Sequence, residues 1–354
     1  IPECMFHSRS LACKKPYGAS PAGEPVEFTV YPRREHSVSR LTLWVEEDGQ
    51  QAVAYPMRWF GLVGARDRYC TSFTPPHSGL YWYWFTFDTA DGPHFCARGY
   101  GGRSEVLDSM GDRYQLTVYD PAYQPPRWFG EGITYNIFPD RFCRDREPVQ
   151  PEGEGIAPRV LHENWDDLPV YRPDEHGEIL NNDFFGGTLR GVMEKLDYLE
   201  SLHVQTIYFN PIFQAYSNHR YDTGDYKRID PLLGSEEDFK TLCEQAEKRG
   251  MRVVLDGVFN HTGYDSRYFN GHGRYDSLGA HQSKDSPYYQ WFDFSEWPDK
   301  YGSWWGIYTL PQVNEHNEDY QNYIFRDADS VVRRWLRLGA SGWRVDVPDE
   351  LPDD

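Results

Sequence analysis

From residue 133 onward, the sequence alternates between short apolar runs and longer amphipathic segments. Four runs have the length and composition of buried strands: 133–138, 204–209, 252–255 and 342–347. Between them, apolar residues recur at the three- and four-residue spacing of a helix that packs by one face. Buried strands that alternate with such helices predict parallel βα units, in either a closed barrel or an open sheet.

The helical faces follow from the same spacing. They are Leu189, Val192, Leu196 and Leu199; Phe239, Leu242, Cys243 and Ala246; and Ile324, Ala328, Val331, Trp335 and Leu338. The second helix is predicted to begin after Ser235, whose hydroxyl can accept from the free amides of the first turn, and to end at Gly250. No glycine-rich phosphate loop follows a strand, which disfavours a nucleotide-binding sheet. Four βα units make half of a (β/α)8 TIM barrel.

The first part of the chain has a different periodicity. Over residues 24–120, apolar and polar residues alternate with a period of two, in short runs separated by Gly, Pro, Asp and Ser. This pattern predicts an all-β sandwich. Prolines 121, 125 and 126 mark a joint. We therefore predict a sandwich domain over residues 1–122 and about four βα units of a barrel over residues 123–354.

The amino-acid composition limits the classes of binding partner. The 55 acidic and 36 basic side chains give a net charge of −19, which disfavours nucleic acid because a phosphate backbone is bound by a basic face. No run approaches the ~20 apolar residues of a membrane helix. Aromatic residues make up 16% of the chain, which suits either stacking on sugars or ordinary packing of a β domain. The six cysteines lack the spacing of a zinc site, so we expect reduced thiols and a cytoplasmic protein.

Polar residues at the carboxyl ends of the predicted strands are the candidates for chemistry, because the active face of a βα barrel lies there. Asp346 follows an apolar strand and lies two residues after Arg344. A guanidinium favours the ionised carboxylate, so the pair is either a nucleophile with its supporting cation or a structural ion pair. His261 could bind a substrate hydroxyl or be a satisfied core histidine, and Tyr221 could stack on a sugar or pack.

Several motifs occur together and in one order. Segments 256–261 (Asp-Gly-Val-Phe-Asn-His) and 342–346 (Gly-Trp-Arg-Val-Asp) resemble two signatures of the α-amylase family of glycoside hydrolases. The sequence also resembles the neopullulanase, cyclomaltodextrinase and maltogenic amylase branch of that family. The supporting segments are 135–142, 182–187, 217–223 and 310–314. The front sandwich is similar to the additional N-terminal domain of that branch in length and strand pattern.

The resemblance implies a role for each matching residue. Asp346 would be the nucleophile of a retaining mechanism, with Arg344 holding it ionised and oriented. Tyr221 would stack under the sugar at the cleavage site, and His261 would bind a hydroxyl of that sugar. Asp256 and Asn260 would mainly shape the site. Residues at about 262–316 would form a small excursion domain along the cleft, and the sandwich would support a homodimer.

Two departures from the family pattern have consequences. Many relatives bind calcium with an acidic and amide-rich loop after the first strand and an Asp after a Gly-Gly pair. The corresponding positions are occupied here by Cys143, Arg144, Asp145, Arg146 and Glu147, and by Thr188. Hard cations need several oxygen ligands, and two basic residues intrude, so no cofactor is required and calcium at this position is possible but disfavoured. The general acid of the family would lie beyond Asp354. We therefore expect the chain to be a fragment that is inactive without that residue.

The predicted activity is hydrolysis of α-glucosidic bonds in maltooligosaccharides, cyclodextrins, pullulan or starch. An exo-acting α-glucosidase of the same family is one alternative. Another is a non-catalytic, glycan-binding or transporter-associated member. Such a member would be free to lose the nucleophile, whereas Asp346 and Arg344 are both present.

Overall fold

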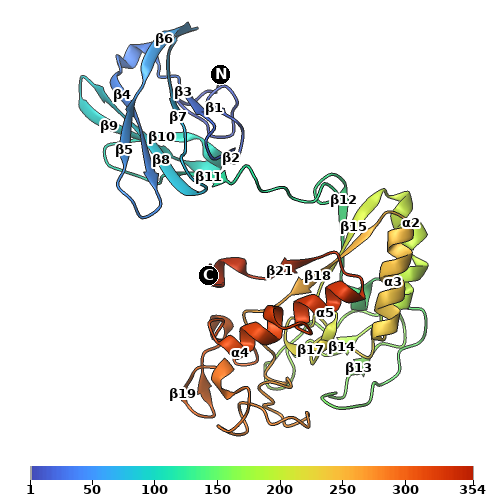
Figure 1. The fold of residues 1–354 in the computed structure, drawn as a ribbon. Helices are drawn as coiled ribbons and strands as arrows, with labels where there is room; N and C mark the ends of the chain where they lie inside the picture. The colour runs from blue at the N-terminus through green and yellow to red at the C-terminus, as the bar shows by residue number, and fades with distance from the viewer. Residues whose placement is uncertain (1, 354) are drawn as a thin grey trace. The chain divides into compact units, whose positions relative to one another are not determined.

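The computed structural model describes residues 2–353, and the chain divides into two compact units, Ile1–Pro125 and Pro126–Asp354 (Figure 1). The first unit is built from two sheets. The four-stranded sheet has the order β1 (Lys14–Lys15), β3 (Val26–Val30), β7 (Arg66–Phe73), β6 (Arg58–Val63). The seven-stranded sheet has the order β10 (Ser104–Leu107), β9 (Gly92–Arg98), β8 (Gly79–Thr89), β11 (Tyr114–Tyr119), β2 (Ser20–Pro21), with β4 (Ser39–Glu47) pairing β8 and β5 (Val53–Pro56) pairing β4.

Aromatic side chains from the two sheets of this unit share one core. Phe28 on β3 meets Tyr83 on β8 with ring centroids 4.9 Å apart, and Phe6 lies 4.7 Å from Phe85. The burial pattern of β3 alternates strictly, because successive side chains of a strand point to opposite faces. The period-two sequence pattern therefore produced the sandwich-like pair of sheets that it predicted.

The second unit contains a four-stranded parallel sheet. Its order is β12 (Ile133–Ile137), β15 (Val204–Phe209), β18 (Arg252–Gly257), β21 (Gly342–Val345), which is also the order in the sequence. The helices between these strands are α1 (Leu189–Glu194), α2 (Leu196–Ser201), α3 (Glu236–Lys248), α4 (Glu318–Gln321) and α5 (Val331–Leu338). Sequential parallel strands joined through helices confirm the predicted βα units.

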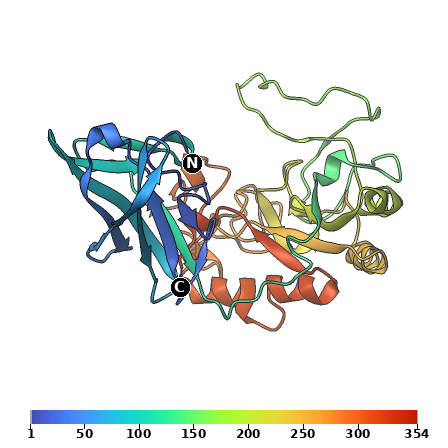
Figure 2. The same ribbon diagram turned by 90° about the horizontal axis from the view of Figure 1, so that it is seen from above.

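Shorter elements decorate this sheet. They are β13 (Val160–Leu161) with β14 (Asp183–Phe184), β16 (Phe213–Ala215) with β17 (Thr223–Ile229), and β19 (Phe294–Glu296) with β20 (Lys300–Tyr301). The segment between β13 and β14, light green in Figure 2, forms a long loop without helix or strand. In the part of the chain that the structure describes, no helix is long and apolar enough to cross a bilayer.

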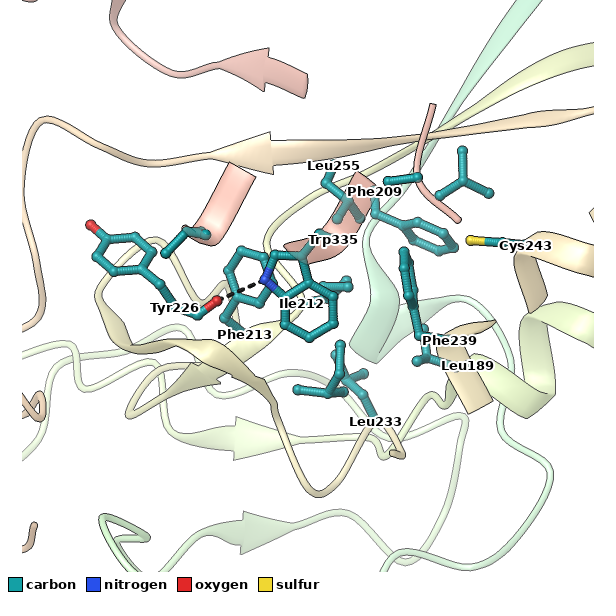
Figure 3. Packing of buried hydrophobic residues seen from close by; sticks show 14 of the residues in the cluster. Leu189, Phe209, Ile212, Phe213, Tyr226, Leu233, Phe239, Cys243, Leu255 and Trp335 are labelled. Atoms are coloured by element: carbon teal, nitrogen blue, oxygen red, sulfur yellow. Dashed lines mark hydrogen bonds between the residues drawn. The ribbon is translucent and has the colours of Figure 1, made fainter. Parts of the chain in front are cut away.

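The core of the second unit is centred on Trp335 of α5 (Figure 3). Its ring lies 5.1 Å from Phe213 and meets Phe239 of α3 edge-on at 5.6 Å. Its indole nitrogen donates to the Tyr226 carbonyl at 2.8 Å, so the only polar atom of the buried ring is satisfied. At the start of α3, Ser235 and Asp238 form the predicted capping box.

The segment around residues 318–338 differs from its prediction as one helix. It forms α4, a π-helical stretch at Asn322–Arg326, and then α5. The extended Asp327 interrupts the helix, and the Ser330 side chain accepts from the Arg333 amide and so begins a new one. Ile324, Val331 and Trp335 are buried as expected, but Ala328 lies in the interruption and is exposed.

The prediction of a buried first strand is also wrong for most of its length. Ile133 is 50% exposed, and only Ile137 of β12 is fully buried. Among the described residues β12 pairs with β15 alone, so this strand lies at an edge of the sheet. The apolar run predicts a strand, but it does not show whether a second strand pairs with it and covers its side chains.

A fully buried ion cluster joins three segments of the second unit that are separate in the sequence. Arg159 donates to both oxygens of Asp230 at 2.7 Å, and Arg220 lies 3.3 Å from the same carboxylate. Both guanidiniums also lie over the Phe184 ring. Burial opposes ionisation of Asp230, but the two cations outweigh it and hold the pKa of Asp230 below its usual value.

Asp230→Asn is expected to lower the free energy of unfolding by about 3–5 kcal/mol, because it leaves two buried guanidiniums without their counter-charge. Denaturant titration measures this loss. Since the folded-state pKa is lowered, the stabilisation is complete above about pH 5 and declines as pH falls. Asp197→Asn is the matched control, because its pair with Arg249 leaves the carboxylate 84% exposed and should be worth under about 1 kcal/mol. Equal effects of the two substitutions would contradict the prediction.

Candidate active site

Three neighbouring strands bring polar side chains together at the carboxyl edge of the parallel sheet. Tyr208 comes from β15, Asp256 from β18 and Arg344 from β21. Asp256 and Arg344 are direct partners in the register of β18 and β21. The sheet therefore places the first signature beside the second without help from any loop.

Asp256 accepts hydrogen bonds from three of these neighbours. The hydroxyls of Tyr208 and Tyr221 donate to its Oδ2 at 2.5 and 2.7 Å, and Arg344 Nη1 donates to Oδ1 at 3.1 Å. The side chain is completely buried. Burial raises the pKa of Asp256 although all three donors oppose that shift. A carboxylate enclosed in this way can hold its neighbours in place but has no free face for a substrate.

Asp346 has a different environment. Its carboxylate accepts from the same Arg344 Nη1 at 2.6 Å, and its amide donates to the Gly257 carbonyl at 3.0 Å. Its side chain remains 16% exposed and lines a pocket of about 820 Å³. One guanidinium nitrogen thus bridges two carboxylates, of which only Asp346 opens to the pocket.

Tyr221 and His261, which the sequence analysis singled out, also line the pocket, as does Trp304 from residues 262–316, called the excursion segment below. Residues 178–181 of the long loop line it as well. A pocket of this size, lined by both aromatic rings and polar side chains, suits a ligand with both apolar faces and hydroxyls.

His261 and Asn260 are buried beside this pocket. His261 Nε2 faces the Tyr221 carbonyl at 3.1 Å, and the Asn260 amide nitrogen lies 3.3 Å from His261 Nδ1. Burial lowers the pKa of His261, so the ring is neutral at neutral pH. These partners assign the proton to Nε2. Both ring nitrogens already have partners inside the protein, so the proposed sugar contact of His261 stays a prediction.

Sequence reasoning missed two residues of this site. Tyr208 lies within a strand run, and its hydroxyl reaches Asp256 from the neighbouring strand. Asn210 directly follows that strand, and its side-chain nitrogen donates to the Tyr221 hydroxyl at 2.8 Å. Polar groups at the carboxyl end of a strand were the signal used elsewhere in the chain, and the same signal would have found both.

The positions corresponding to the calcium loop of relatives are occupied by hydrogen bonds within the protein. Arg144 donates to the carbonyls of His162, Glu163 and Phe185 at 3.4, 3.0 and 3.4 Å. Asp183 accepts from His162 at 2.8 Å and is thus occupied too. Within residues 2–353, no group of three or more His, Cys, Asp or Glu side chains is arranged to hold a metal ion.

Comparisons with known proteins address the family. The family described as "Alpha amylase, catalytic domain" matches residues 136–354. An amylopullulanase of Thermoanaerobacter thermohydrosulfuricus is 34% identical over 96% of this chain and 25% of that protein. The intracellular maltogenic amylase of Bacillus subtilis (strain 168) is 33% identical over 84% of this chain and 47% of that protein.

Comparison with solved structures supports the same family. The type III pullulan hydrolase from Thermococcus kodakarensis superposes with a TM-score of 0.55 and 27% identity, over 98% of this chain and 56% of that chain. The chain therefore spans a quarter to about half of the length of these relatives. The resemblance read from the motifs is confirmed: this chain belongs to the α-amylase family of glycoside hydrolases.

Proposed function

We propose that this protein takes part in retaining hydrolysis of α-glucosidic bonds in maltooligosaccharides, cyclodextrins, pullulan or starch, with Asp346 as nucleophile. One observation carries the assignment: Arg344 bridges two carboxylates, and only Asp346 opens to the pocket. The relatives named amylopullulanase, maltogenic amylase and pullulan hydrolase support the substrate class.

In the proposed first step, an Asp346 oxygen attacks the anomeric carbon and the bond to the leaving glycosyl oxygen breaks. Arg344 donates to this carboxylate at 2.6 Å and fixes its orientation. Tyr221 lies beside the sugar, and its hydroxyl is held by Asn210 and Asp256. Water then cleaves the glycosyl-enzyme. The acid that protonates the leaving oxygen is proposed to come from sequence outside these 354 residues.

The same proposal extends to the architecture. We propose that the four βα units belong to a (β/α)8 barrel, with residues at about 262–316 as its excursion domain. The half-exposed Ile133 of β12 and the partly exposed Val345 of β21 support it, since apolar strand edges in proteins are normally covered. A homodimer through the sandwich and a cytoplasmic location are further expectations. The six cysteines are all free, as a reducing compartment requires.

Asp346→Asn in the full-length protein is expected to lower kcat on maltooligosaccharides by about 10⁴-fold or more, because the amide cannot form the glycosyl ester. Steady-state kinetics measure this loss, and calorimetric titration with maltoheptaose should show binding within about threefold of the unmodified protein. Near-normal turnover would remove Asp346 from the nucleophile role. An unmodified protein that binds but does not hydrolyse would favour the non-catalytic alternative, and release of glucose from chain ends alone would favour the α-glucosidase.

Tyr221 can be tested by separating its hydroxyl from its ring. Tyr221→Phe removes the hydrogen bonds to Asp256 and Asn210, and we expect kcat to fall by about tenfold. Tyr221→Ala also removes the stacking surface and should raise KM by a further factor of about five to ten. The control is Tyr198→Phe, since Tyr198 lies on α2 with half of its surface exposed. If the phenylalanine and alanine variants share one KM, Tyr221 is no sugar platform.

We further propose that Arg144 replaces the cation at the former calcium position. An excess of EDTA should change the Tm by less than about 1 °C, because no metal is bound there to remove. Arg144→Gln should lower the free energy of unfolding by about 1–3 kcal/mol, because the shorter neutral side chain leaves carbonyls unpaired. Differential scanning calorimetry measures both. A large loss of Tm in EDTA that calcium restores would refute this proposal.

A further inference from the structure

Two adjacent tryptophans hold one carboxylate at the edge of the pocket. Trp304 Nε1 donates to Glu350 Oε2 at 2.8 Å, and Trp305 Nε1 donates to Glu350 Oε1 at 3.0 Å. Hydrogen bonds to an ionised acceptor are roughly twice as strong as neutral ones. Both oxygens of Glu350 are therefore held by residues of the excursion segment, which lie 46 and 45 positions earlier in the sequence.

The rings extend this contact to the site. Trp304 and Trp305 stack with centroids 5.1 Å apart and an interplanar angle of 26°. Trp304 also stacks on His261 at 5.6 Å and 29°. These three rings connect the chain after β18 to the excursion segment. Glu350 then connects the two tryptophans to the turn after β21. Trp304, His261 and Asp346 all line the same pocket.

The backbone at both ends of this contact is strained. Trp305 has a φ of 53° and Val347 a φ of 41°, in the left-handed region that bulky and β-branched residues avoid. Val347 directly follows Asp346 and precedes the turn Pro348–Glu350. Such conformations persist only where the surroundings determine them, and they gather at functional sites.

We propose that Trp304 and Trp305 are positioning residues for the hydrolysis proposed above, which act on Asp346 through Glu350. The turn that carries Asp346 is fixed at two points. The Asp346 amide is bonded to Gly257, and the two indoles hold Glu350 at the far end of the turn. Without the second point, Val347 is free to relax from its strained conformation. The Asp346 carboxylate then moves relative to the sugar, and a displacement of about 1 Å can cost about 100-fold in rate.

The test keeps an aromatic ring at both positions and removes the indole N–H donors. W304F/W305F in the full-length protein should lower kcat on maltoheptaose by about tenfold or more, with KM changed by less than about threefold. E350Q retains one acceptor oxygen, so its kcat should lie between that of the double variant and that of the unmodified protein. The control is W59F, because Trp59 donates to Asp67 at 2.9 Å in the first unit and so loses the same kind of bond without lining the pocket. W59F should leave kcat and KM unchanged.

Hydrogen exchange provides a second, activity-independent readout. The amides of Glu350 and Leu351 donate within the turn, to Val347 and Pro348. Peptides that cover this turn should exchange at least about tenfold faster in W304F/W305F, while peptides from β18 keep their rates. An unchanged kcat in an active protein, a change in KM alone, or unchanged exchange of the turn would each overturn the inference. If the unmodified protein does not hydrolyse maltoheptaose, the proposed function fails, and the exchange experiment still decides whether the tryptophans hold the turn.

Discussion

The candidate site depends on one shared cation. Arg344 Nη1 lies 3.1 Å from Asp256 and 2.6 Å from Asp346, so two carboxylates at the edge of the sheet share a single guanidinium. Two carboxylates side by side would otherwise repel, and one of them would take up a proton. Coulomb attraction to Arg344 offsets this repulsion and holds Asp346 where it meets the pocket. Burial lowers the pKa of Arg344, but the two carboxylates outweigh burial, so the pKa of Arg344 is raised above its usual value.

This arrangement requires a rigid frame, and the parallel sheet supplies it. Strand register makes Asp256 and Arg344 neighbours, and Tyr208 reaches the same carboxylate from the next strand. Below the edge, the packing around Trp335 joins α3 and α5 to the loops that precede the site. The chemistry and the core are therefore coupled: a shift of one strand would break the bridge between the two carboxylates.

The sequence predicted those features whose cause is local. Periodicity identified the strands and helix faces, Ser235 identified a cap, and the two signatures identified Asp346 and its neighbours. Features that depend on neighbours distant in sequence escaped it. The exposure of Ile133 is set by the absence of a second pairing strand among the described residues, and the tie from Trp304 to Glu350 spans 46 residues. The break in the helix before Val331 had a local signal in Ser330, which the apolar spacing concealed.

Arginine–aspartate pairs in this chain show why sequence alone could not decide between a nucleophile and a structural ion pair. Asp230 is enclosed by Arg159 and Arg220, and no part of its carboxylate is exposed. The carboxylate of Asp256 is also fully buried, and it accepts hydrogen bonds from two tyrosines and Arg344. Asp346 has one cation partner and a free side toward a pocket. The residue types are the same in all three cases, so the number of partners and the remaining exposure separate them. Both are properties of the folded chain, and they make Asp346 the carboxylate that a sugar can reach.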